Sequence, residues 1–197
     1  NSSTPRWSYS TGDTVRAVAI SEDFFGQQRY HLAAGDWNGK VYLFHNNNSS
    51  PIWNHTTGDS IYSVAITDDS GYVAVGSKDY SVYLLDGDGT SLWSYATGGT
   101  VLSLDFSVDG EELVVGSDKI YLFDKDRGTP LWSYTAGDGI FSVAISSNGE
   151  TIVAGSLDNS VYLFSKDGML LWSYSTGNRV WSVAISEDGE TIVAGSW

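Results

Sequence analysis

Apolar and polar positions along the chain recur in a fixed order of four short segments. Each round opens with a segment such as Leu-Trp-Ser-Tyr at 92–95, and two almost wholly apolar segments follow, as at 140–146 and 151–156. It closes with a segment such as Val-Tyr-Leu-Phe at 161–164, and turns containing Gly with Asp or Asn lie between the segments. Short apolar segments separated by such turns predict β-strands joined as antiparallel hairpins.

The four segments repeat with a period near 40 residues. Residues 171–196 match residues 131–156 at 18 of 26 positions. The first Trp of each round lies at Trp7, Trp53, Trp93, Trp132 and Trp172, with spacings of 46, 40, 39 and 40 residues. The repeat units are therefore 7–52, 53–92, 93–131, 132–171 and 172–197, the last one partial. A fixed period of this length indicates a tandem-repeat architecture.

The second and third segments lack a clean alternation of apolar and polar positions, which predicts sheets covered on both faces. Small residues within the second segment would let neighbouring sheets interlock; they are Ala17, Ser63, Ser103, Ser142 and Ser182. Four-stranded sheets repeated in tandem and covered on both faces predict an all-β fold, a β-propeller of about five repeats. A Greek-key sandwich is the competing fold, but it gives no reason for the strict period.

The first repeat begins with its Trp segment, whereas the last repeat ends after its third segment. By segment type there are five Trp segments, five second, five third and only four fourth segments. The last unit lacks its hairpin between the third and fourth strands. We therefore expect residues 1–197 to form either one propeller domain or part of a larger one. The chain would belong to a longer propeller, would complete a ring with other copies of itself, or would close a five-sheet ring with one defective sheet.

Composition narrows the classes of function. The net charge is −14 and no Lys/Arg cluster occurs, which argues against nucleic acid as a partner. The chain has no Cys, so disulfides and thiolate metal sites are excluded. No apolar run approaches 18 residues, so no membrane-spanning helix is expected.

Two propeller families share local patterns with this chain. Gly-Ser-x-Asp-x-x-Val before an aromatic strand, at 76–83 and 155–162, resembles WD-repeat proteins. Asp-Lys-Asp-Arg-Gly-Thr-Pro-Leu-Trp at 124–132 resembles the repeat of pyrroloquinoline-quinone (PQQ) enzymes and of the outer-membrane assembly lipoproteins that share their fold. The resemblance implies that Asp124 and Gly128 form a turn and that Trp132 docks on the neighbouring sheet. By extension, the repeated Trp7, Trp53, Trp93, Trp132 and Trp172 are expected to be structural docking residues.

Candidate chemistry is sparse. Asp86-Gly87-Asp88-Gly89 is similar to the opening of a calcium loop, but the twelfth position of an EF-hand needs Glu and here it is Thr97. His31, His45 and His55 have no metal-binding spacing. We therefore expect no catalytic residue, no metal site and no cofactor. A PQQ-dependent dehydrogenase remains an alternative through the resemblance, although the vicinal cysteine pair that such enzymes often use is absent.

A binding surface is the remaining candidate. The turns before the second strand and after the third should lie at one end of the central channel. Large side chains vary there between otherwise similar repeats: Arg16, Trp37, Tyr62, Lys78, Phe141 and Trp181 are the candidate binding residues. They would bind a protein or a small ligand, or they would only pack between sheets.

The sequence thus predicts a non-enzymatic binding or scaffold module, with two alternatives. One is a fragment of the PQQ-type dehydrogenase; the other is a recently amplified or engineered repeat that assembles into a ring. Many small polar residues and a start without Met favour an extracellular or cell-surface location. Glycosylation sequons occur at Asn1, Asn47, Asn48 and Asn54 and would matter only in an exported protein. The insertion carrying Phe24-Phe25 in the first unit would be either a contact surface or folded back on its sheet.

Overall fold

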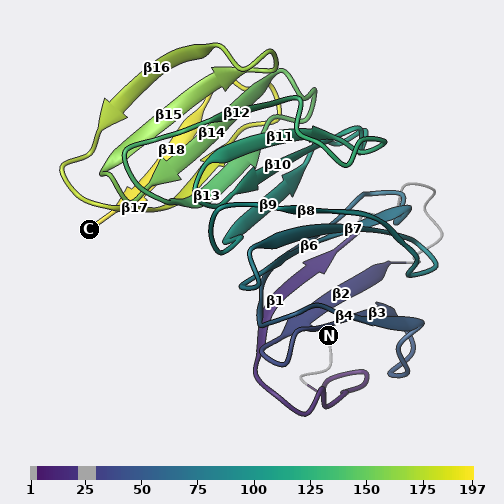
Figure 1. The fold of residues 1–197 in the computed structure, drawn as a ribbon. Helices are drawn as coiled ribbons and strands as arrows, with labels where there is room; N and C mark the ends of the chain where they lie inside the picture. The colour runs from purple at the N-terminus through teal and green to yellow at the C-terminus, as the bar shows by residue number, and fades with distance from the viewer. Residues whose placement is uncertain (1–3, 22–29) are drawn as a thin grey trace.

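The computed structural model describes residues 4–21 and 30–197 as eighteen β-strands in five antiparallel sheets, with no helix among those residues (Figure 1). Four sheets have four strands each and the fifth has two, which confirms an incomplete β-propeller fold. The insertion with Phe24-Phe25 and the sequon at Asn1 lie outside the described residues.

The strands follow one another along the chain and pair in that order within each sheet. Sheet 1 contains β1 (Val15–Ile20), β2 (His31–Asp36), β3 (Lys40–His45) and β4 (Trp53–Thr56). Sheet 2 contains β5 (Ile61–Ile66), β6 (Tyr72–Ser77), β7 (Ser81–Asp86) and β8 (Ser91–Ala96). Sheet 3 contains β9 (Ser103–Phe106), β10 (Glu112–Gly116), β11 (Ile120–Asp124) and β12 (Trp132–Tyr134). Sheet 4 contains β13 (Ile140–Ile145), β14 (Thr151–Ser156), β15 (Ser160–Ser165) and β16 (Leu170–Ser175), and sheet 5 contains β17 (Val180–Ile185) and β18 (Ile192–Ser196).

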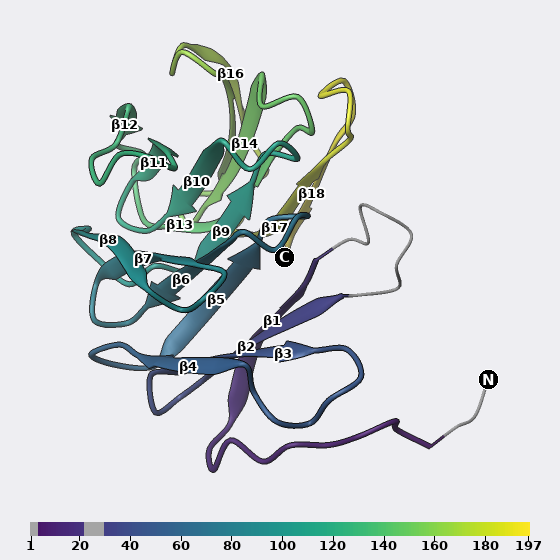
Figure 2. The ribbon, with the colours of Figure 1, turned by 90° about the vertical axis from the view of Figure 1, so that its right-hand side faces the viewer.

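The sheets are out of phase with the repeat units by one strand. Each four-stranded sheet takes three strands from one unit and the Trp strand from the next, so β4, β8, β12 and β16 are outermost (Figure 2). The expectation that the four strands of one unit form one sheet is therefore wrong. The first Trp segment, 7–10, is described but is not a strand.

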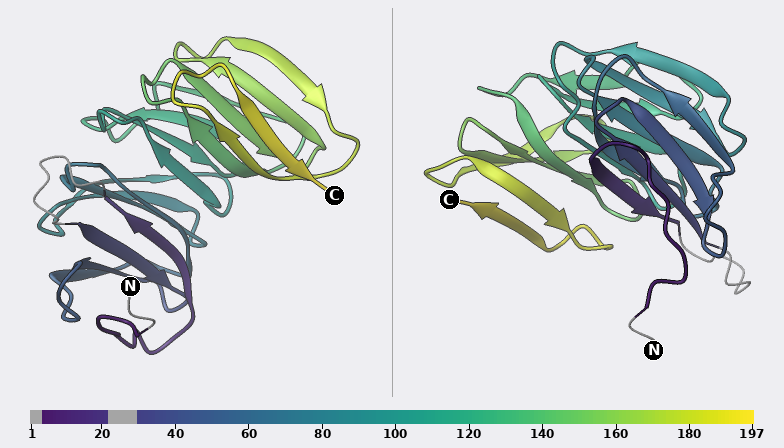
Figure 3. Two further views of the ribbon diagram at one scale, coloured as in Figure 1. Left: turned by 180° about the vertical axis from the view of Figure 1, so that it is seen from behind. Right: turned by 90° about the horizontal axis from the view of Figure 1, so that it is seen from below.

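The five sheets form an open arc. Their first strands, β1, β5, β9, β13 and β17, are consecutive neighbours and make its inner wall. Sheet 1 and sheet 5 lie at the two ends of the arc (Figures 1 and 3). The alternative of a closed five-sheet ring is not what the structure shows.

Adjacent sheets interlock through a glycine and a β-branched residue. The glycine lies at the end of the second strand of one sheet (β2, β6, β10 or β14), and a residue at or just before the start of the next sheet's first strand packs over it. A Cβ at Gly76 would lie 2.6 Å from the Val101 side chain, and one at Gly155 would lie 2.6 Å from Val180. Gly35 with Ile61 and Gly116 with Ile140 make the same contact. Only a glycine leaves room for this close approach.

The Asp-Gly and Asn-Gly hairpin turns are not type I′ turns, which would need positive φ at both central residues. Positive φ occurs at Gly110, Gly149 and Gly189, but the preceding Asp or Asn residues do not share it. Asp109 instead accepts hydrogen bonds from the Ser107 hydroxyl at 2.7 Å and from the Glu111 N–H at 3.2 Å. The acidic residue stabilises the turn through its side chain, and the glycine alone supplies the left-handed backbone.

We predict that Gly155→Ala lowers the free energy of unfolding by about 1–3 kcal/mol, because the new methyl group overlaps Val180. The matched control is Gly195→Ala, at the same repeat position in β18. A Cβ there would meet only Ser182 of its own sheet, at 3.9 Å. The control should change stability by less than about 0.5 kcal/mol in dilute protein. Urea unfolding measures both; equal effects of the two substitutions would contradict the packing rule.

Candidate functional site

Four of the five repeated tryptophans dock on a turn of a neighbouring sheet. In each of these four the indole N–H donates to a backbone carbonyl in the turn after the third strand of that sheet. The donor and acceptor pairs are Trp7 with Asn46 and Trp53 with Gly87, both at 2.9 Å, and Trp93 with Lys125 and Trp132 with Lys166, both at 2.8 Å. Gly89 and Gly168 lie directly against the indoles of Trp53 and Trp132, where a Cβ would come within 2.7 Å. Each of these four contacts joins one indole to one turn.

Trp172 belongs to the same series but has a different environment. It lies on β16, is 40% exposed and borders a pocket with Gly189 and Glu190 of the β17–β18 turn, and no described turn carbonyl accepts a hydrogen bond from its indole. Trp7 shows the opposite situation, since it docks on the turn after β3 although its own segment belongs to no sheet. At the start of the arc the turn after β3 thus has an indole docked on it, whereas at the other end the Trp172 indole has no described turn carbonyl as a partner.

A second repeated contact organises the turns at one end of the arc. An Asp after the second strand of a sheet accepts a hydrogen bond from the backbone N–H of a Gly in the turn before that sheet's first strand, as Asp79 does from Gly58 at 2.7 Å. The same carboxylate accepts from the hydroxyl of Tyr83 on the third strand, β7, at 2.6 Å. Gly98 with Asp118 and Tyr121, and Gly137 with Asp158 and Tyr162, repeat the arrangement. These acids, which lie in the motif that resembles WD repeats, are therefore engaged within the fold.

Four of the six predicted binding residues pack against one another in pairs. The Arg16 guanidinium lies over the Tyr62 ring, 4.4 Å from its centroid, and so joins β1 to β5. The rings of Phe141 and Trp181 meet edge to face with centroids 4.5 Å apart, and so join β13 to β17. Both pairs link neighbouring inner strands, and packing between sheets accounts for their size.

The other two predicted binding residues lie in the turns of the same end. Trp37 is exposed, and its carbonyl accepts a hydrogen bond from the Ser60 hydroxyl at 2.8 Å. The Lys78 ammonium lies 3.8 Å from the Asp59 carboxylate in a solvent-exposed ion pair. The structure therefore brings the six residues to one end of the arc without gathering them in one pocket.

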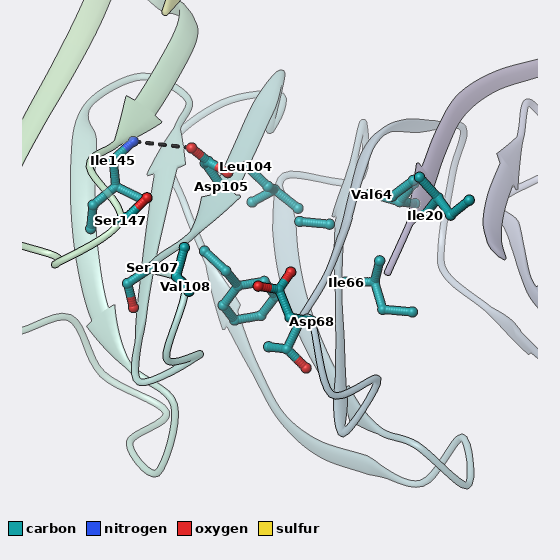
Figure 4. Close-up of a pocket in the computed structure, with 14 residues that line it drawn as sticks. Ile20, Val64, Ile66, Asp68, Leu104, Asp105, Ser107, Val108, Ile145 and Ser147 are labelled. Carbon is teal, nitrogen blue, oxygen red and sulfur yellow. Dashed lines mark hydrogen bonds between the residues drawn. The ribbon is translucent and has the colours of Figure 1, made fainter. Parts of the chain in front are cut away.

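A pocket opens on the inner wall towards the other end of the inner strands. Its volume is about 430 Å³. Residues of β1 and β5 line one side and residues of β9 and β13 line the other, with the connecting turns below (Figure 4). Its apolar lining includes Ile20, Val64, Ile66, Leu104, Val108 and Ile145, and its polar lining includes Asp68, Asp105, Ser107 and Ser147. The pocket therefore combines apolar walls with carboxylates and hydroxyls, and no basic side chain is among the described residues that line it.

Asp105 is the residue of this pocket that departs from the repeat. The corresponding position is Ala in the other four inner strands: Ala19, Ala65, Ala144 and Ala184. One Asp105 carboxylate oxygen accepts a hydrogen bond from the Ile145 N–H at 3.0 Å, across the junction of sheets 3 and 4. Burial raises the pKa of Asp105 to about 6, although backbone N–H groups of Ile145 and Phe106 favour its charged form.

Serines on the inner strands make related links. The Ser103 hydroxyl accepts a hydrogen bond from the Val143 N–H, and the Ser142 hydroxyl accepts from the Val183 N–H, both at 3.1 Å. The sequence predicted small residues here only as room for interlocking. Their hydroxyls also satisfy backbone donors at the inner edge of the next sheet.

The remaining titratable groups form no further chemical site in the part of the chain that the structure describes. There, no cluster of three or more His, Asp or Glu side chains is arranged to hold a metal ion. His31 and His45 face each other across β2 and β3, with ring centroids 4.5 Å apart. Burial, and secondly the neighbouring His45, lower the pKa of His31. No described helix is long and apolar enough to cross a membrane.

The protein is a tandem-repeat protein of the β-propeller type. Its sheets follow one another along the chain, their first strands form an inner wall, and indoles dock on the turns of neighbouring sheets. Residues 37–194 match a family model described as outer membrane protein assembly factor BamB, which is built from PQQ-type repeats. The match covers more than half of the chain, so the protein belongs to this PQQ-type repeat family. Among curated proteins, none matches the chain.

We predict that Trp132→Ala lowers the free energy of unfolding by about 2–4 kcal/mol, because it removes the indole packing and the hydrogen bond to Lys166. Trp172→Ala, at the matching position in β16, should cost less than about 1 kcal/mol, because no described turn carbonyl accepts a hydrogen bond from that indole. Chemical denaturation followed by circular dichroism measures both changes. A Trp172 effect as large as that of Trp132 would contradict the docking interpretation.

The raised pKa of Asp105 predicts a pH-dependent contribution to stability. Folding favours the protonated acid, so its stabilising contribution is complete below about pH 4 and is lost as the pH rises through about 6. From about pH 4 to about pH 7 the wild type should therefore lose about 1–3 kcal/mol relative to Asp105→Asn. Other acids titrate in both proteins and cancel in the difference. Parallel pH dependences of unfolding would show that Asp105 titrates normally.

Proposed function

We propose that this protein is a non-enzymatic binding module whose partner occupies the pocket on the inner wall of the arc. The observation that carries the proposal is Asp105. It replaces a small apolar residue at one position of an otherwise regular repeat, in the middle of the wall and at the edge of a pocket. A half-buried carboxylate that loses part of its hydration costs folding free energy, which a contribution to binding would explain.

The chemistry of the pocket favours a partner segment with a basic side chain next to apolar ones. Asp68 and Asp105 supply negative charge, and Val64, Leu104 and Val108 supply apolar contact. The net charge of −14 would further attract a basic segment at low ionic strength. A volume of about 430 Å³ suits one or two side chains rather than a folded surface.

The family description supports a location outside the cytoplasm. It names an outer membrane protein assembly factor. We propose that this chain, too, acts as a protein-interaction scaffold outside the cytoplasm, at the cell surface or in the extracellular space.

The test is a titration with two short peptides, acetyl-Leu-Lys-Leu-amide and acetyl-Leu-Gln-Leu-amide. Methyl NMR signals of Ile66, Leu104 and Val108 report on occupation of the pocket. We expect these signals to shift with the lysine peptide and the glutamine peptide to bind about tenfold more weakly. Asp105→Asn should abolish the difference, while Asp188→Asn, in an exposed turn of sheet 5, should preserve it. No shift of the pocket methyl groups with either peptide would overturn the proposal.

A parallel titration separates binding from the dehydrogenase alternative. Pyrroloquinoline quinone is added with Ca²⁺, and its absorption spectrum and reduction by a primary alcohol are followed. The proposal expects an unchanged spectrum and no reduction. A stoichiometric spectral change together with alcohol-dependent reduction would favour the enzyme.

A further inference from the structure

The outer face of sheet 1, at the start of the arc, exposes Val15 and Val18, whose counterparts are buried in every other sheet. Val18 is 74% exposed, whereas Val64, at the same position one sheet later, is 8% exposed. Val15 is also exposed, although its counterpart Ile61 is fully buried. Together with Leu32 and Tyr9, Val15 and Val18 line a pocket of about 190 Å³ with a largely apolar surface.

The outer face of sheet 5, at the other end of the arc, is exposed in a complementary way. Val193 on β18 is 64% exposed, whereas its counterpart Val153 on β14 is fully buried against Val180 and Val183. Gly195 is the counterpart of Gly155, but no β-branched side chain of a next sheet packs on it in the described residues. This face therefore presents a glycine and a valine without the side chains that cover them elsewhere.

The two faces are the two halves of one interface. At each of the four junctions inside the arc, a glycine on the second strand of one sheet receives the β-branched residue that precedes or opens the next inner strand. Gly195 offers the receiving half and Val15 offers the inserting half. Val193 and Val18 take the positions that Val153 and Val183 occupy at the junction of sheets 4 and 5.

We propose that two copies of this chain associate head to tail, with sheet 1 of one copy stacked on sheet 5 of the other. Val15 of the second copy lies over Gly195, and Val18 of the second copy packs on Val193. The contact is heterologous, because different faces of the two copies meet. This proposal is independent of the ligand at the inner wall.

Charge opposes the association but does not set its geometry. The net charge of −14 on each copy generates repulsion that salt screens. Apolar burial at the interface is insensitive to such screening. The dissociation constant should therefore fall when the salt concentration is raised.

The test uses two variants that each block one face. Val18→Lys removes the inserting face, and Val193→Lys removes the receiving face. In sedimentation velocity the wild type should exceed its monomer mass of 21.3 kDa as concentration rises, and salt should enhance this. Each variant alone should remain monomeric, with its dissociation constant raised at least tenfold. An equimolar mixture should form pairs and stop there, because each pair uses the one intact face of each variant.

Three outcomes would overturn the proposal. In the first, the wild type stays monomeric at all concentrations, as expected if further repeats of a longer chain normally cover these faces. In the second, the single variants still associate. In the third, the mixture does not pair. Circular dichroism and urea midpoints establish that both variants fold. If a lysine variant does not fold, Val18→Ser and Val193→Ser test the same faces.

Discussion

The close approach of neighbouring sheets depends on a single steric requirement, the absence of a side chain at one position of the second strand of each sheet. Where Gly76 or Gly155 lies, a valine from the following sheet occupies the space that a Cβ would take. That contact brings the inner strands near enough for serine hydroxyls to reach backbone N–H groups of the next sheet. The indole contacts then join the outer edges of the same sheets, as Trp53 does with Gly87 and Trp132 with Lys166. A wider spacing at the glycine would lose both sets of contacts, since packing energy falls steeply with small gaps.

Most of the architecture was predictable because the repeat reports the same local environment several times. The strands at 140–146 and 161–164 and the docking of Trp132 all followed from the period and from apolar patterning. The assignment of strands to sheets was not predictable in the same way. Periodicity is unchanged when the unit is shifted by one strand, so nothing in residues 132–171 indicates that Trp132 pairs backwards with sheet 3. Hydrogen-bond register between distant segments decides that point.

The site was less predictable than the fold. Variation at Arg16, Tyr62, Phe141 and Trp181 suggested recognition, but those side chains meet each other across junctions, which the sequence alone does not reveal. Asp105 carried a signal that was overlooked, a carboxylate where four other repeats have alanine. Comparison of the units position by position identifies it, because an acid in a buried strand costs free energy wherever it lacks a role.

The one-strand offset between repeat unit and sheet has a consequence for how such a chain grows. Because each unit from the second onward contributes strands to two sheets, the covalent chain connects each sheet to the next through paired strands. An unequal crossover that duplicates one repeat of about 40 residues therefore adds one whole sheet, wherever its breakpoints fall. The duplicated outer strand pairs with the sheet formed by the unit before it. The match of 18 in 26 residues between 131–156 and 171–196 is the trace that such a recent genetic duplication would leave.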